Sequence, residues 1–269
     1  MGSADVTTDS LVPEGRRYTA VAVAKDTGVV CGIEAATLAF TLLNPKAKVT
    51  VFKKDGDKIK PGDKIFTVEG NRSILTSERV ALNFLQHLSG VSTSTAAFVE
   101  AVEGTTAVIL DTRKTIPGLR ELDKYAVKTG GGVCHRMGLY DAVLVKDNHI
   151  RAAGWERIAE SAELWRKNKD VEFVEIEAQS LDEVKKALAI NPDIILLDNF
   201  SLVDIKKAVK MIHALPPGKR PQIEISGCVN IKNVRAYAQT GADRISVGRI
   251  THSAPALDIS LEIYDENSK

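Results

Sequence analysis

The sequence predicts an α/β protein in two parts, and two observations support this prediction. Residues 17–75 alternate short apolar runs with turn residues, and apolar positions at helical spacing follow as far as residue 102. From residue 107 onward, apolar strand candidates alternate with amphipathic stretches, and roughly 20 to 35 residues separate successive strand starts, as in βα units. The change of pattern predicts a division into residues 1–104 and 105–269. A C-terminal helix that packs back on the first part is compatible with this division.

The first part combines turn, strand and helix signals. Residues 55–63 carry two glycines and a proline; because glycine permits positive φ and proline presets a turn, this stretch predicts a hairpin. A helix is predicted to follow Ser77, with an interruption at Gly90, and a second helix is predicted over residues 92–102. These signals together indicate a mixed domain of strands and helices.

The second part has a regular period. Its strand candidates lie at residues 107–110, 142–145, 173–176, 194–197, 222–225 and 244–247. The stretches between them carry apolar residues at helical spacing. A complete (β/α) barrel has eight units, so the shorter series predicts either an open, incomplete barrel or a doubly wound sheet.

The composition excludes several classes of protein. The chain has 269 residues, with 36 Lys and Arg against 35 Asp and Glu, a net charge of +1. This balance argues against a general nucleic-acid or membrane-surface binder, which would carry a basic excess. No apolar run approaches the ~20 residues of a membrane helix. The three cysteines form no CxxC pair, so we expect no disulfide framework, no cysteine zinc site and a cytoplasmic location.

Polar or glycine residues follow each strand candidate of the second part. In chain order they are Arg113 and Lys114, Lys146, Glu177, Asp198, Ser226 and Gly227, and Gly248 and Arg249. The carboxyl ends of parallel strands converge on one crevice in barrels and in open α/β sheets. A single polar strand end is unremarkable in itself, but six specialised ends predict one functional site.

A basic cluster falls within residues 113–149, which hold seven Lys and Arg against four acids. Five cations of this window lie at loops or strand ends: Arg113, Lys114, His135, Arg136 and Lys146. They predict a cage for an anion with more than one charge, because Arg binds carboxylates as a bidentate fork and Lys adds a point charge. Arg120, Lys124 and Lys128 are spaced as in a helix and are expected on its solvated face.

Residues 171–200 carry the opposite sign, with seven acids against two lysines. Glu177 and Asp198 end consecutive strand candidates and can share a Mg²⁺ ion, which needs only one or two carboxylates beside substrate phosphate oxygens. The alternative, that each acid pairs with a basic neighbour, stays open at this point.

Glycine-bearing loops follow the last two strand candidates, at Ser226-Gly227 and at Gly248-Arg249. Such loops, with a helix start nearby, are the usual phosphate cradle of this architecture. A multiply charged anion, a magnesium ion and a phosphate in one crevice indicate phosphoribosyl chemistry.

Six runs, in order along the chain, resemble the nicotinate-nucleotide pyrophosphorylase family, also called quinolinate phosphoribosyltransferase. They are residues 77–83, 111–120, 130–139, 146–149, 197–200 and 247–253. The resemblance implies an N-terminal α/β sandwich domain at residues 1–104 and a C-terminal, incomplete six-unit α/β barrel at residues 105–269. It also implies an enzyme of NAD biosynthesis, which joins quinolinate to phosphoribosyl pyrophosphate and yields nicotinate mononucleotide, pyrophosphate and CO₂, with Mg²⁺.

The resemblance further implies roles for single residues. The quinolinate carboxylates would be held by Arg113, His135, Arg136 and Lys146, with Lys114 nearby. The catalytic group would comprise Lys146, Glu177 and Asp198, of which the two acids serve the magnesium and the ribose. The 5-phosphate would be bound by Ser226, Gly227 and Gly248, with Arg249 as an added contact. Arg79 would reach the neighbouring subunit's site, which implies a homodimer with shared sites or a hexamer built from such dimers.

The sequence departs from the family pattern in the phosphate loops. Cys228 stands where a second glycine is commoner, and Arg249 where a small residue is commoner. Two rivals stay open: a molybdenum-transport-associated relative of the same fold, and a phosphate-binding barrel without catalysis. The intact run at 146–149 and the presence of both Glu177 and Asp198 favour the quinolinate enzyme.

Overall fold

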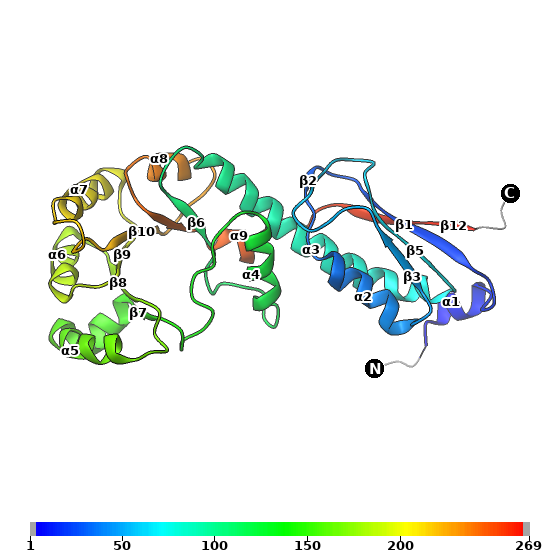
Figure 1. Cartoon of the computed structure of the whole chain (residues 1–269), viewed down its shortest axis with the longest axis horizontal. Helices are drawn as coiled ribbons and strands as arrows, with labels where there is room; N and C mark the ends of the chain where they lie inside the picture. The colour runs from blue at the N-terminus through cyan, green and yellow to red at the C-terminus, as the bar shows by residue number, and fades with distance from the viewer. Residues whose placement is uncertain (1–3, 266–269) are drawn as a thin grey trace. The chain divides into compact units, whose positions relative to one another are not determined.

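The computed structural model describes residues 4–265, which fall into two compact units. The first unit takes the chain up to Ala96, the segment Glu121–Gly131 and the chain from Ser253 onward; the second takes Ala97–Arg120 and Gly132–His252. The sequence analysis divides the chain once, near residue 104, whereas each of these units is built from separate segments of the chain. Figure 1 labels the elements of both units.

A four-stranded antiparallel sheet forms one layer of the first unit, in the order β12-β1-β5-β3. Its strands are β1 (Tyr18–Ala24), β3 (Lys48–Val51), β5 (Lys64–Gly70) and β12 (Ile259–Asp265). β12 pairs with β1 along its whole length, with Ala22 opposite Leu261. The end of the chain does return to the first unit, but as an edge strand and not as the helix that the sequence analysis allows for.

Two helices form the second layer, α2 (Ile33–Leu43) and α3 (Ser73–Ala101). Both contribute to a buried apolar cluster with the sheet, in which the rings of Phe40 and Phe66 meet edge to face at 6.0 Å. The α/β sandwich that the resemblance implies is therefore confirmed. The predicted break at Gly90 is wrong, because α3 runs through it. Glycine is needed there for close approach: a Cβ atom would collide with the carbonyl group of Pro255.

The remaining elements of the first unit are short. They are α1 (Val6–Leu11), β2 (Gly28–Val29), β4 (Lys58–Ile59) and α4 (Arg120–Thr129). The turn glycines Gly56 and Gly62 have positive φ, but the strand between them, β4, pairs with β2 and not with the next strand, so the predicted hairpin is wrong. Lys124 of α4 is buried and not solvated, since α4 packs on α3, where Ser92 donates to the Ala126 carbonyl at 2.7 Å.

The second unit is built on a parallel sheet in the order β6-β11-β10-β9-β8-β7. Its strands are β6 (Val108–Leu110), β7 (Val143–Val145), β8 (Val174–Ala178), β9 (Ile194–Asp198), β10 (Gln222–Ser226) and β11 (Arg244–Ser246). The first strand lies beside the last, and the two edges, β6 and β7, are consecutive in the chain. This order is that of an incomplete barrel, whereas a doubly wound sheet reverses its order at a switch point.

Helices connect the strands of this unit and lie along the outside of the sheet in Figure 1. They are α5 (Asp147–Lys167), α6 (Leu181–Ile190), α7 (Leu202–His213) and α8 (Val234–Ala238), and a further short helix, α9 (Arg249–His252), follows the last strand of the unit. Ser180 and Ser201 cap α6 and α7 by accepting the N–H groups of Glu183 and Asp204. No helix within residues 4–265 has the length and apolar character that a membrane crossing requires.

Candidate active site

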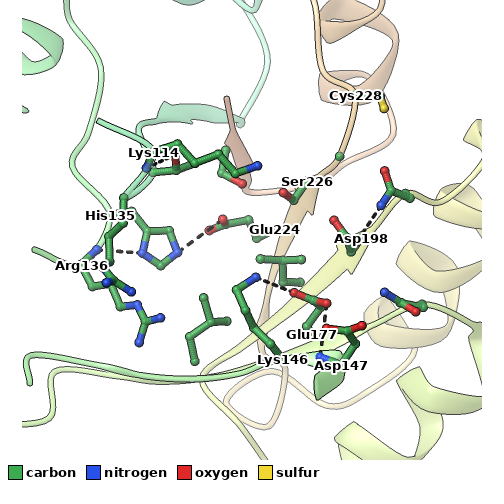
Figure 2. A pocket seen from close by; sticks show the side chains of 18 residues that line it. Lys114, His135, Arg136, Lys146, Asp147, Glu177, Asp198, Glu224, Ser226 and Cys228 are labelled. Atoms are coloured by element: carbon green, nitrogen blue, oxygen red, sulfur yellow. Dashed lines mark hydrogen bonds and ion pairs between the residues drawn. The ribbon is translucent and has the colours of Figure 1, made fainter. Parts of the chain in front are cut away.

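A cavity of about 550 Å³ opens at the carboxyl ends of the second unit's strands. In a strand, alternate side chains share a face, so the last inward-facing residues of neighbouring strands meet here. Ser226 of β10 lies opposite Asp198 of β9 in the sheet register. Figure 2 shows these side chains around the cavity together with cations from the loops.

Most of the residues predicted for the site line this one cavity. They are Arg113, Lys114, His135, Arg136, Lys146, Glu177, Asp198, Ser226 and Gly227. Gly248 is not part of the lining, although a Cβ atom on it would lie 3.1 Å from the Lys114 side chain. Arg249 is exposed at the start of α9 and also lies outside the lining.

One side of the cavity is basic; we call Arg113, Lys114 and Arg136 the basic wall. Burial lowers the pKa of Arg136, and the nearby charge of Arg113 lowers it further. The Nε atom of Arg113 is buried and makes no hydrogen bond to any residue within 4–265. Two guanidinium groups held this close, one with an unused buried donor, match an anionic ligand that interacts with both.

The opposite side is acidic; we call Glu177 and Asp198 the acidic wall. Burial raises the pKa of Asp198, and the Glu177 carboxylate raises it further. Asn199 donates to Asp198 at 2.7 Å. Glu177 accepts a hydrogen bond from Lys146 Nζ at 2.7 Å, so the basic-neighbour alternative holds for Glu177 in this state.

The Lys146 side chain comes from the end of β7, where the chain turns into α5. The Lys146 backbone N–H donates to His149 Nδ1 at 2.9 Å, which fixes the first turn of the helix. The side chain of Lys146 is about half exposed, at 47%. Lys146 thus lines the cavity and pairs with the acidic wall.

The loop after β10 depends on glycine. Gly227 has φ of +92°, and a Cβ atom there would lie 2.8 Å from the backbone nitrogen of Asn199. Cys228, the departure from the family pattern, also has positive φ, at 51°, and lines the cavity. A left-handed conformation is unfavourable for a non-glycine residue, which accounts for the glycine that is commoner at that position.

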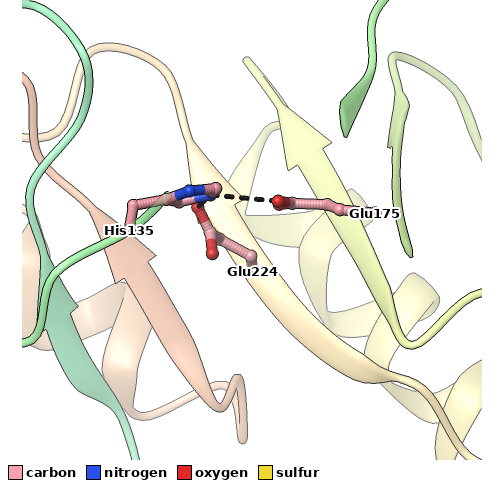
Figure 3. A group of neighbouring side chains, drawn as sticks. All are labelled: His135, Glu175 and Glu224. Atoms are coloured by element: carbon pink, nitrogen blue, oxygen red, sulfur yellow. Dashed lines mark ion pairs between the residues drawn. The ribbon is translucent and has the colours of Figure 1, made fainter. Parts of the chain in front are cut away.

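At the floor of the cavity lie charged side chains that the sequence analysis does not single out; Glu224 lines the cavity, whereas Glu175 and Arg244 do not. Glu175, Glu224 and Arg244 stand two residues before the strand-end positions Glu177, Ser226 and Ser246. With His135 they form what we call the buried cluster, and Figure 3 shows the His135 ring facing both carboxylates. The signal in the sequence is the alternation itself, since polar residues at i and i+2 of a buried strand point to the same interior.

Arg79 belongs to the first unit, on α3. Its side chain is exposed, at 68%, and its guanidinium lies 3.8 Å from Glu78. The structure therefore shows this residue as part of a surface helix face, and its predicted contact with another subunit stays a prediction.

Comparison with known proteins places the whole chain in one family. Residues 5–89 match the family model described as "Quinolinate phosphoribosyl transferase, N-terminal domain", and residues 91–262 match the C-terminal domain of the same family. A nicotinate-nucleotide pyrophosphorylase [carboxylating] of Mycobacterium leprae is 40% identical over 262 residues, which cover 96% of this chain and 91% of the relative.

Solved structures agree. The nicotinate-nucleotide pyrophosphorylase of Ehrlichia chaffeensis matches with a TM-score of 0.89 at 42% identity, over 97% of this chain and 93% of that one. The enzyme of Francisella tularensis matches with a TM-score of 0.88 at 38% identity, over 98% and 91%. The likeness thus extends over both units.

Proposed function

This chain belongs to the quinolinate phosphoribosyl transferase family, and from that premise we propose that it transfers the phosphoribosyl group of phosphoribosyl pyrophosphate to quinolinate. The products are nicotinate mononucleotide, pyrophosphate and CO₂, which makes the chain a pentosyltransferase of NAD biosynthesis. The names of its relatives describe this activity. The observation in the structure that supports it most is the basic wall.

Quinolinate carries two adjacent carboxylates, and the basic wall suits such a dianion. Arg113 and Arg136 lie close enough that the charge of one lowers the pKa of the other, so a ligand that brings two negative charges relieves their repulsion. The buried Nε of Arg113 has no hydrogen-bond partner within 4–265 and would gain one. Each charge-assisted hydrogen bond contributes about 1.5–3 kcal/mol, which favours a dicarboxylate over a monocarboxylate.

The reaction then needs orientation more than a covalent nucleophile. With its carboxylates on the basic wall, quinolinate presents its ring nitrogen to the anomeric carbon; the nitrogen–carbon bond forms as the bond to pyrophosphate breaks. The acidic wall, Glu177 and Asp198, stabilises the positive charge that develops on the ribose. The carboxylate beside the new ring cation leaves as CO₂, its electron pair stays on the ring carbon, and that carbon takes up a proton.

Glu177 and Asp198 also fit a Mg²⁺ ion. Two carboxylates line one cavity, and the proximity of Glu177 raises the pKa of Asp198, a repulsion that a divalent cation would remove. Magnesium prefers such oxygen ligands and keeps several waters or substrate oxygens. When bound, it would supply charge neutralisation for the departing pyrophosphate. Lys146, paired with Glu177, is placed to compensate the acidic wall when the metal is absent.

The working unit that we propose is a cytoplasmic homodimer with shared sites. Arg79 supports it, because this cation lies on an exposed helix face of the first unit, while all residues of the cavity lining belong to the second. In a two-fold dimer each contact between the subunits occurs twice. If Arg79 of one subunit reaches the cavity of the other, the dimer has two equivalent shared sites.

Subunit exchange tests the shared site. Inactive Arg79→Ala chains mixed with inactive Arg136→Ala chains would form mixed dimers in which one site regains both arginines, so activity should return. If exchange is verified and activity stays at the level of the separate variants, the shared site is wrong.

The activity itself is tested by following pyrophosphate and CO₂ release from purified chain with phosphoribosyl pyrophosphate. We expect release with quinolinate and Mg²⁺, in equal amounts of the two products, and loss of release in EDTA. Nicotinate serves as the control substrate, since its single carboxylate uses only part of the basic wall. A chain that binds phosphate without releasing pyrophosphate would overturn the proposal.

A further inference from the structure

The buried cluster of the second unit has no part in the mechanism above, yet it is costly to keep. The side chains of Glu175 and Glu224 are completely buried, and that of His135 is 7% exposed. Taking charged groups out of water costs several kcal/mol for each ion unless they are paired and hydrogen-bonded. A buried cluster of charges at the floor of the cavity calls for a physical reason.

The members of the cluster contact one another. His135 Nε2 lies 3.0 Å from Glu175 Oε2 and 3.5 Å from Glu224 Oε1, and Arg244 Nε donates to Glu224 at 2.8 Å. The Phe173 ring packs against His135 edge to face at 5.7 Å, and the Arg244 guanidinium lies 5.7 Å from the centre of that ring. Ion pairs thus link the members of the cluster, while Glu175 Oε1 is buried and makes no hydrogen bond to a residue within 4–265.

The second ring nitrogen of His135 is also engaged. The backbone N–H of Arg136 donates to His135 Nδ1 at 2.7 Å, and the backbone N–H of His135 donates to Asp111 Oδ1 at 2.8 Å. Figure 2 shows the ring between Arg136 and Glu224. Both ring nitrogens thus face protein groups, although the resemblance implies that His135 holds a substrate carboxylate.

The two carboxylates and the Arg136 N–H act on the ring in opposite ways. Burial disfavours the charged ring, but the hydrogen bonds to Glu175 and Glu224 outweigh it and raise the pKa of His135 to about 9. The N–H that points at Nδ1 opposes a second proton there. The ring that accepts from Arg136 therefore carries its one proton on Nε2, facing the carboxylates; we call this link from the Arg136 N–H through His135 to the glutamates the bridge.

Resting on the function proposed above, we propose that Glu175, Glu224 and His135 are positioning residues that hold Arg136 in the dicarboxylate site without binding quinolinate through their polar atoms. The bridge fixes the backbone of Arg136, and the Ala142 carbonyl, which accepts from Arg136 Nη1 at 3.1 Å, fixes its side chain. Glu175 also places a negative charge near Arg136 and so offsets the repulsion from Arg113. Preorganisation of this kind lowers the cost of binding.

A metal ion is the other occupant that this geometry suggests. One ligand atom from each of His135, Glu175 and Glu224 lies within 4.8 Å of the others. Arg244 argues against it, because its guanidinium already pairs with Glu224 and would lie beside the ion. Metal content of the purified chain, measured after dialysis, decides this point.

The experiment compares Glu175→Gln with the matched control Glu172→Gln, an exposed glutamate just before the same strand. We would measure dissociation constants for quinolinate and for phosphoribosyl pyrophosphate by calorimetry, and the Michaelis constants of both. Glu175→Gln is expected to weaken quinolinate about tenfold or more, or ~1.4 kcal/mol, and to change phosphoribosyl pyrophosphate less than about twofold. Glu172→Gln should match the wild type.

Two substitutions at His135 separate the ends of the bridge. The oxygen of His135→Asn can still accept from the Arg136 N–H but is too short to reach the glutamates, whereas the amide of His135→Gln reaches the glutamates and leaves Arg136 without its acceptor. Both substitutions are expected to weaken quinolinate binding and to leave phosphoribosyl pyrophosphate binding nearly unchanged. If Glu175→Gln does not fold, these two variants test whether the buried cluster positions Arg136.

Equal loss of both substrates, unchanged quinolinate binding in these variants, or a stoichiometric bound transition metal would each overturn the inference. A wild-type chain that neither binds quinolinate nor releases pyrophosphate would instead overturn the proposed function.

Discussion

The charges of the basic wall and of the acidic wall are compensated in different ways. The basic wall holds two neighbouring arginines, one with a buried Nε that bonds to no residue within 4–265. The acidic wall already has a cation, since Lys146 lies 2.7 Å from Glu177. The basic wall therefore needs an anionic ligand to compensate its charge. Glu177 of the acidic wall can instead exchange its pairing with Lys146 for pairing with a bound cation.

The largest effect should follow from the acidic wall. Glu177→Gln keeps the size of the side chain and an acceptor for Lys146 but removes the charge that stabilises the ribose, so kcat should fall by about 10²–10³. The quinolinate Michaelis constant should change much less. Steady-state kinetics on both substrates measure this, and a variant with nearly wild-type kcat would remove Glu177 from the catalytic group.

The basic wall should act on one substrate. Arg113→Ala and Arg136→Ala each remove a charge-assisted contact of about 1.5–3 kcal/mol, so quinolinate binding should weaken about ten- to a hundredfold while phosphoribosyl pyrophosphate binding stays nearly constant. Arg157→Ala, at an exposed arginine on α5, is the control. Equal losses for the two ligands would assign these arginines to the phosphate site.

The ionised side chain of Asp198 should lower the stability of the folded chain although activity requires it. Burial and the Glu177 charge raise its pKa in the folded state, so its protonated form is favoured by folding, and that contribution is lost as pH rises through the raised pKa. At pH 7 the charged side chain is therefore destabilising. Asp198→Asn should raise the thermal midpoint at pH 7 more than at pH 4 and should reduce activity strongly. A midpoint that falls at pH 7 would contradict the raised pKa.

The smallest effect is expected at Cys134, beside the buried cluster. No step of the proposed reaction uses a thiol nucleophile, so Cys134→Ser should keep most of the activity. A loss of more than about a hundredfold, some 2.7 kcal/mol, would show that the mechanism lacks a residue.

Strand periodicity made the second unit predictable. All six strand candidates are strands, and their polar carboxyl ends meet in one cavity as the convergence of parallel strands requires. The choice between barrel and doubly wound sheet needed the strand order, which depends on long-range pairing that no local pattern records.

Other features depend on contacts between distant segments. The sequence predicts a helix break at Gly90, yet α3 runs through this residue, and glycine is required there because a Cβ atom would collide with the backbone of Pro255. The helical spacing of Lys124 predicts a solvated side chain, but Lys124 is buried because α4 packs on α3. Glu175 and Glu224 stand two positions before the strand ends and share their interior face, and their burial depends on the long-range packing that encloses this face.

The account is tested most directly by calorimetric titration of the wild-type chain with quinolinate and with nicotinate, repeated on Arg136→Ala. If the basic wall awaits two carboxylates, quinolinate should bind about ten- to a hundredfold more tightly than nicotinate, one charge-assisted contact of about 1.5–3 kcal/mol. In Arg136→Ala the two ligands should bind with similar affinity. Equal binding of both ligands to the wild type, or a preference that survives the loss of Arg136, would contradict the account.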